Sequence, residues 1–110
     1  MVAIPKPLPR IPKPIHLFPD GHAENDPETL SISKREEALF STKISKSAVE
    51  VVFDINGTPF DSDRFLVQAG METQSGPLRE GVKLGEQYGY HVRPIKGAGP
   101  FADPTIIIQE

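Results

Sequence analysis

Apolar and polar residues alternate along much of the chain, most regularly in segment 87–94. Tyr88, Tyr90 and Val92 are each separated there by one residue, so a pleated strand places all three large side chains on one face. Such a face has to be covered, and other strands of the same chain are the available cover. The alternation therefore predicts an all-β protein whose core lies under this strand.

Short segments of similar pattern recur between glycine, proline and other turn residues. Six or seven short strands at intervals of about 8–12 residues are typical of an antiparallel two-sheet β-sandwich. Ile106, Ile107 and Ile108 are continuous rather than alternating, which indicates burial on both faces or a covered edge. Segment 70–76 is predicted to be a loop. The predicted strands are 29–33, 49–55, 64–69, 82–84, 87–94 and 105–109.

Segment 34–40, KREEALF, is compatible with two structures. Most of its residues are good helix formers, and Ser33 is able to cap a helix. Seven residues make at most about two turns, which are marginal without packing. A polar loop that leads into a strand over 40–44 is the alternative.

The N-terminal part of the chain has a different composition from the rest. Six of the twelve prolines precede Asp20, whereas proline averages about 5% of residues. Because proline fixes φ and biases the preceding residue toward extended backbone, this segment is predicted to approximate polyproline II. Residues 19–28 are acidic and rich in turn formers. We therefore expect an extended arm and acidic linker over 1–28, outside a sandwich domain of residues 29–110.

The apolar side chains of the arm predict a contact surface, because burial stabilises each by about 1.5–3 kcal/mol. Lys6, Pro9 and Pro12 fit the basic-x-x-Pro-x-x-Pro pattern that SH3-type grooves accept. Packing on the arm's own domain or a neighbouring subunit is a second use, and a stiff spacer is a third. The predicted partner-binding residues are Ile4, Leu8, Pro9, Ile11, Pro12, Ile15, Leu17 and Phe18.

Charge and composition exclude several classes of function. The formal charge of −3 gives no reason to expect nucleic-acid binding through bulk electrostatics. The absence of cysteine excludes disulfides, thiolate metal sites and cysteine nucleophiles. No run of 18 apolar residues is present, so we expect a soluble chain without membrane insertion. Nothing in the composition indicates a compartment.

Motifs for catalysis or metal binding are missing from the sequence. No G-x-S-x-G occurs, and the acidic pairs lie in segments typical of solvated surface. His16 and His22, with Asp20, supply ligand types for a divalent ion, but nothing pre-organises them. His91 alternates with the predicted core face, which indicates a surface residue with a cross-strand partner. We predict no enzyme, no cofactor and no metal site.

Residues 85–92, GEQYGYHV, resemble the penultimate-strand signature of cupredoxin-like β-sandwiches, in which a glycine turn leads into G-x-Y-x-Y-x-C. In copper-binding members, the resemblance implies, the last position is the thiolate ligand, and a histidine and a methionine follow in the next loop. Val92 stands at that position here, and 93–101 contain neither residue. The resemblance therefore implies the fold without copper. An immunoglobulin-like sandwich is similar enough to be the alternative.

These observations predict a non-enzymatic binding or structural module. The arm is expected to mediate self-association into a homo-oligomer or to bind a protein partner. The alternative is a sandwich that binds a small molecule or a carbohydrate through Tyr88, Tyr90 or His91 together with loop 71–78.

Overall fold

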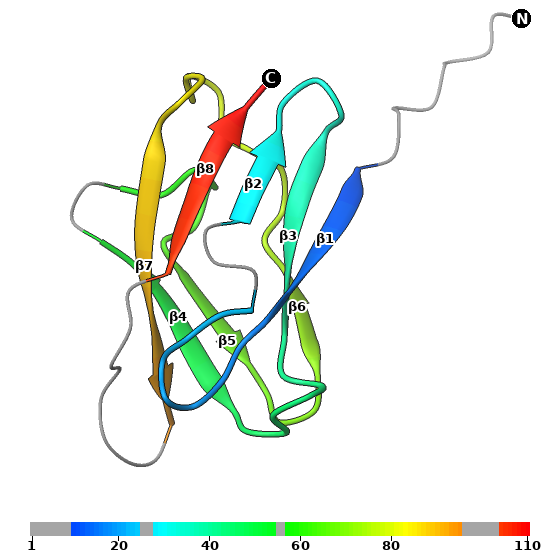
Figure 1. Ribbon diagram of the computed structural model, residues 1–110, viewed down its shortest axis with the longest axis vertical. Coiled ribbons are helices and arrows are strands. Elements are labelled where there is room, and N and C mark those ends of the chain that lie inside the picture. Colours follow the sequence, from blue (N-terminus) through cyan, green and yellow to red (C-terminus); the bar gives the residue numbers. More distant parts are fainter. Residues whose placement is uncertain (1–9, 25–27, 55–56, 96–103) are drawn as a thin grey trace, which may run out of the picture.

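The computed structural model describes residues 10–24, 28–54, 57–95 and 104–110, and this part of the chain is all-β. Its strands form a three-stranded sheet of order β1-β3-β6 and a five-stranded sheet of order β2-β8-β7-β4-β5 (Figure 1). No helix able to span a membrane occurs in these ranges. The strands are β1 (Ile11–His16), β2 (Glu28–Ser31), β3 (Glu36–Ser41), β4 (Val49–Phe53), β5 (Arg64–Val67), β6 (Glu72–Gln74), β7 (Gln87–Pro94) and β8 (Thr105–Gln109).

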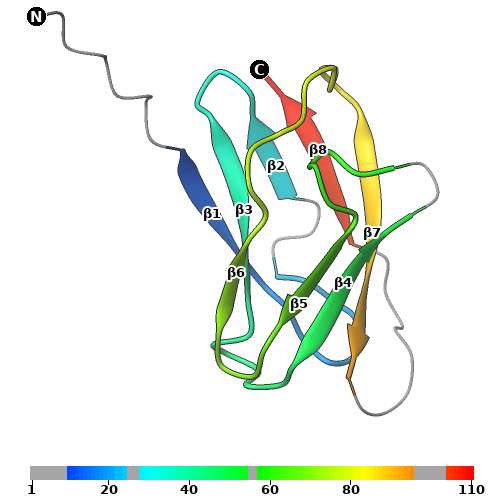
Figure 2. The ribbon, with the colours of Figure 1, turned by 180° about the vertical axis from the view of Figure 1, so that it is seen from behind.

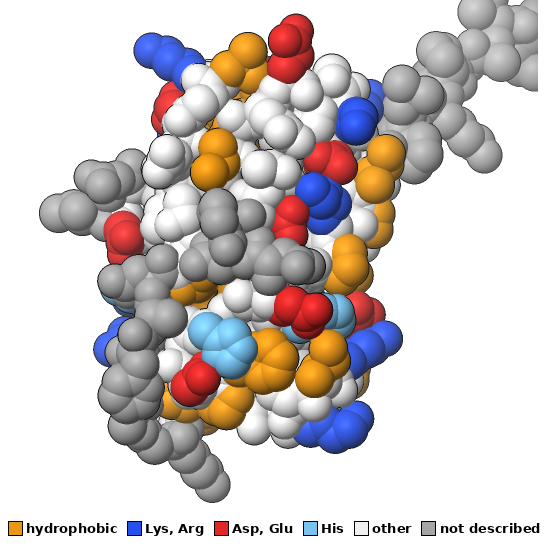
Figure 3. Space-filling model, in the orientation of Figure 1, with side chains coloured by type: hydrophobic (Ala, Val, Ile, Leu, Met, Phe, Trp, Pro, Cys, Tyr) orange, Lys and Arg blue, Asp and Glu red, His pale blue; other side chains and the backbone are white. Residues whose placement is uncertain are grey.

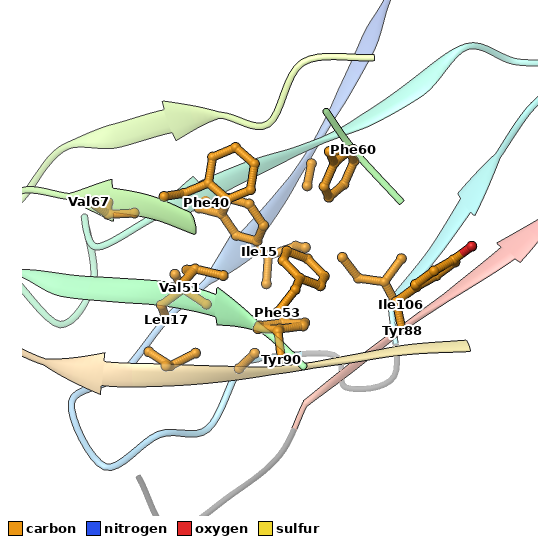
Figure 4. Packing of buried hydrophobic residues seen from close by; sticks show 14 of the residues in the cluster. Ile15, Leu17, Phe40, Val51, Phe53, Phe60, Val67, Tyr88, Tyr90 and Ile106 are labelled. Carbon is orange, nitrogen blue, oxygen red and sulfur yellow. The ribbon is translucent and has the colours of Figure 1, made fainter. Parts of the chain in front are cut away.

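The two sheets share one hydrophobic core, in the manner of a β-sandwich (Figure 4). Phe40 of β3 reaches from the smaller sheet to the larger one, and its ring centroid lies 5.2 Å from that of Phe65 and 6.1 Å from that of Tyr90. Tyr88, Tyr90 and Val92 are all buried, as the alternation in 87–94 predicts. The prediction of an all-β, two-sheet protein is thus confirmed.

The sheets are mixed rather than antiparallel, and the described strands number eight rather than six or seven. β1 pairs in parallel with β3, and β2 pairs in parallel with β8. Two of the strands, β1 and β6, lie where the sequence predicted an arm and a loop. β5 and β6 belong to different sheets but run side by side (Figure 2), and Thr73 Oγ1 donates to Leu66 O at 2.8 Å.

Segment 34–40 contains a strand and no helix. Its alternate residues Ala38 and Phe40 are buried in the core, and β3 is the central strand between β1 and β6. Pairing on both sides supplies backbone partners that an isolated short helix lacks, so the tertiary contacts outweigh the helix propensity. The strand covers 36–41 rather than the alternative 40–44.

The predicted strand at 82–84 is also wrong, because these residues belong to the turn before β7. Lys83 N donates to a carboxylate oxygen of Glu86 at 3.0 Å, and Glu86 N donates to Lys83 O at 3.2 Å. Local hydrogen bonds thus close the turn in place of a ladder. The strands at 87–94 and 105–109 have the predicted bounds, and those near 29–33, 49–55 and 64–69 are shorter than predicted.

Residues 11–17 belong to the sandwich, which corrects the prediction that the whole leader, residues 1–28, is an arm and linker outside the domain. Ile11 N donates to Arg35 O at 3.0 Å and Leu17 N donates to Ser41 O at 2.8 Å. Backbone N–H directions alternate along a strand, so Pro12 and Pro14, the residues without an N–H, occupy positions that point away from β3. Residues 1–9 of the predicted arm lie outside the described residues.

Candidate functional site

The predicted partner-binding residues divide between core and surface. Ile15 and Leu17 are fully buried inside their own sandwich, so they are not available to a partner. Ile11 is 49% exposed, and Pro12 is exposed beside it. Phe18 is partly buried and stacks on His22 with ring centroids 4.3 Å apart. Ile4, Leu8 and Pro9 fall outside the described residues.

The predicted ligand-binding set of Tyr88, Tyr90 and His91 is not brought together. The two tyrosines point into the core from β7, whereas His91 points to the opposite face of the strand. His91 Nε2 lies 2.6 Å from Oδ1 of Asp54, which gives this histidine the surface position and cross-strand partner expected from its place in the alternation. The three side chains therefore do not share one surface on which a small ligand could bind.

Tyr88 takes part in a closed set of hydrogen bonds at the end of the core. Its hydroxyl donates to the Glu86 carboxylate. The hydroxyl oxygen of Tyr88 also lies 3.5 Å from Arg79 Nη2. Burial, followed by the neighbouring Glu86, raises the pKa of Tyr88, while the hydrogen bond from Tyr88 lowers the pKa of Glu86. Arg79 Nε also donates to Thr58 O at 2.6 Å. These contacts hold segment 79–88 in place.

A cluster of charges joins β1 to β2 and β3. Lys13 Nζ donates to Thr29 O at 2.7 Å and lies 2.9 Å from Glu28 Oε1. It lies 4.0 Å from Glu36 Oε1, which also accepts a hydrogen bond from Ser31 N at 2.7 Å. Acidic and basic side chains lie side by side over this part of the face in Figure 3. Each of these charges has a partner, so the cluster fixes β1 on the sandwich.

An open cleft of about 320 Å³ lies where β1 begins, and we call it the Arg35 cleft. The β2–β3 turn and the segment after β6 provide its sides. Ser75 holds that segment beside β3, because Ser75 N donates to Ala38 O and Ala38 N donates to Ser75 Oγ, both at 2.9 Å. The cleft is lined by Arg10, Ile32, Arg35, Glu36, Pro77 and Leu78.

Arg35 sits in the β2–β3 turn with a positive φ of 57°. The turn is closed by Arg35 N, which donates to Ile32 O at 3.0 Å, and by Lys34 N, which donates to Ser31 Oγ at 3.2 Å. The Arg35 guanidinium has no hydrogen bond or ion pair with any described residue. Within the described residues the cleft therefore combines an unpaired cation, Arg35, with an apolar wall. Sequence reasoning did not find it, because its residues come from three distant segments.

A second hollow, of about 280 Å³, lies at the other end of the sandwich. It is lined by Pro19, Ser47, Ala48, Pro94 and Ile95, and it contains no charged side chain. Among the described residues that line this hollow, Ser47 is the one with a polar side chain.

Metal binding has no support in the described ranges, where no group of three or more histidine, aspartate or glutamate residues is placed to hold an ion. His22 Nδ1 bonds to Asp20, and Val92, at the position of the copper thiolate in the resemblance, is fully buried in the core. Comparison of the chain with protein-family models, curated proteins and solved structures finds no match in any of the three.

Proposed function

We propose that this protein is a non-enzymatic binding or structural module whose leader mediates self-association or binds a protein partner. The observation that carries the proposal is the docking of β1. The leader is fixed to the sandwich from Ile11 onward, so residues 1–9 join the domain at a defined point beside Ile11 and the Arg35 cleft. Ile11 and Ile32 are 49% and 39% exposed there, which supplies apolar contact area.

The contact is expected to use side chains rather than strand addition. β1 is an edge strand, and edge strands with free N–H groups pair readily with other chains. Pro12 and Pro14 remove two outward N–H groups from this edge. A partner therefore gains few backbone hydrogen bonds along β1.

The cupredoxin-like resemblance is the finer fold assignment that we propose for the sandwich. Its support is the mixed pairing, since immunoglobulin sandwiches are built from antiparallel sheets whereas β1/β3 and β2/β8 are parallel here. The assignment concerns architecture, and fold alone carries no function.

Binding of a small molecule is the second candidate function, and the Arg35 cleft is the observation that favours it. Pro77 and Leu78, from the predicted loop 71–78, line this cleft. Tyr88, Tyr90 and His91 are not among its lining residues, so the site differs from the one expected from the sequence.

Deletion of residues 2–9 tests the leading proposal, because it leaves Arg10 and the whole of β1 in place. A longer deletion that removes β1 also removes Ile15 and Leu17 from the core. Light scattering is expected to show an oligomer for the full chain and a monomer for the deletion. The control is a chain of the same length with a Gly/Ser segment at 2–9. A monomeric full chain, or an oligomer of unchanged mass in the deletion, refutes self-association through the leader.

Partner binding is tested separately by titrating a panel of SH3 domains with the full chain. Lys6→Ala, which removes the basic residue of the motif, is expected to weaken any specific complex. Equal binding by the variant refutes recognition of the Lys6, Pro9 and Pro12 pattern.

A further inference from the structure

We propose that the Arg35 cleft is a binding site for a carboxylate attached to a compact apolar body. The two chemical sources of such a group are a free branched or linear carboxylic acid and the C-terminus of a peptide that ends in an apolar residue. The inference is independent of the leader's role, because no residue of 1–9 is needed for it.

Two arginines, Arg10 and Arg35, line the cleft. Arg35 contributes a guanidinium that has no partner among the described residues. Arg10 is held in place by its Nε, which donates to Glu37 at 2.9 Å, while its terminal nitrogens make no bond within the described structure. A guanidinium presents a planar set of donors that matches the two oxygens of a carboxylate.

The two acidic residues beside the cleft have contacts of their own, although Lys13, the cation near Glu36, approaches Glu28 more closely, at 2.9 Å. Glu36 lines the cleft, but its Oε1 accepts a hydrogen bond from Ser31 N at 2.7 Å and lies 4.0 Å from Lys13 Nζ. Glu37 is buried and paired with Arg10. Arg35 is thus the cation of the cleft whose guanidinium forms no ion pair or hydrogen bond within the described residues.

The rest of the cleft suits an apolar body. Ile32 is half-exposed, Pro77 is exposed, and Leu78 packs against the core from the cleft side. The volume of about 320 Å³ lies at the lower end of the range for small-molecule sites and is large enough for a branched apolar body such as a leucine side chain. An apolar wall next to one or two placed cations is the usual composition of such sites.

Three probes test the proposal on the full chain by NMR titration. They are 4-methylpentanoate for a free acid, N-acetyl-leucine for a peptide C-terminus, and 4-methylpentanamide as the neutral isostere. At least one acid is expected to bind saturably and to shift the resonances of Ile32, Arg35 and Leu78. The amide is expected to bind about tenfold more weakly or worse, because it loses a charge-assisted contact. The tighter of the two acids identifies the source.

Arg35→Gly and Lys46→Gly form a matched pair of variants. Lys46 also has a φ of 57°, and it lies outside the cleft-lining residues, so both changes remove one positive charge and relieve the same backbone conformation. Arg35→Gly is expected to weaken acid binding about tenfold or more, and Lys46→Gly to leave it unchanged.

Three results overturn the proposal. The first is the absence of saturable binding of either acid up to the order of 10 mM. The second is equal affinity of acid and amide for the unaltered chain, a comparison that does not depend on any variant folding. The third is an equal effect of the two glycine variants. Deletion of residues 2–9 is expected to leave acid binding intact, which separates this inference from the proposed function of the leader.

Discussion

Replacing Ile15 with alanine tests whether β1 contributes to the core. The Ile15 side chain is fully buried within the cluster that both sheets share. Truncating a buried isoleucine to alanine costs about 2–5 kcal/mol, the sum of lost transfer energy and the cavity left behind. Domains of this size have total stabilities of about 5–15 kcal/mol, so the expected loss is a large part of the whole. The melting temperature is expected to fall by roughly 10 °C or more, at about 4–8 °C per kcal/mol.

Ile11→Ala is the matched control for this measurement. Ile11 lies on the same strand, has the same side chain and is 49% exposed, so its truncation is expected to cost less than about 1 kcal/mol. Urea unfolding of both variants, with unchanged m-values, gives the two free energies directly. Equal losses for the two variants would refute the assignment of β1 to the core and restore the view of the leader as an external arm.

Three further predictions concern the sheets and the core. In Gly89→Ala the new Cβ lies 2.5 Å from Asp54 Oδ2, so we expect the free energy of unfolding in urea to fall by about 1 kcal/mol. When Asp54→Ala is already present, the same substitution is expected to raise the free energy of unfolding. A rise in both backgrounds contradicts this prediction. Pro14→Ala adds an N–H that points away from β3, so we expect the free energy of unfolding to fall by less than about 1 kcal/mol and light scattering to show more self-association. A fall of more than about 2 kcal/mol contradicts the outward direction of the Pro14 nitrogen. The pKa of Tyr88 is raised above its ordinary value of 10.0, so the neutral phenol stabilises the fold below that pH, and this contribution is lost as the pH rises through the folded pKa. Tyr88→Phe is therefore expected to lose less stability than the parent chain between pH 9 and 11. Parallel curves of stability against pH for the two proteins contradict the prediction.

The sequence predicted best two strands with strong local patterns, the alternating β7 and the continuous isoleucine run of β8. β7 and β8 have their predicted bounds, because local pattern and tertiary burial agree there. β3 was ambiguous because its residues favour a helix locally, and its strand form depends on pairing with β1 and β6, which no local window shows. β6 is three residues long and polar, so it offers no pattern at all.

The spacing of the prolines in the leader is a local pattern that indicates an edge strand. Pro12 and Pro14 are two residues apart, and the residues between and after them, Lys13, Ile15 and Leu17, share the inward face of β1. Prolines at a period of two are compatible with an edge strand, because only every second N–H is needed by the neighbour. The Arg35 cleft had no such signal, since the turn and the segment after β6 meet only in the folded chain.

The parallel pairing of β2 with β8 has a consequence for how the chain folds. β8 lies between β2 and β7, so residues 28–31 have their partner about 80 positions further along the sequence. Closing so long a loop is slow, and the edge of β7 at Gln87, Tyr88 and Gly89 has unpaired backbone groups until residues 105–109 arrive. During synthesis the larger sheet therefore remains incomplete until the segment through residue 109 has left the ribosome, and chains that stop before 105 expose that edge to aggregation.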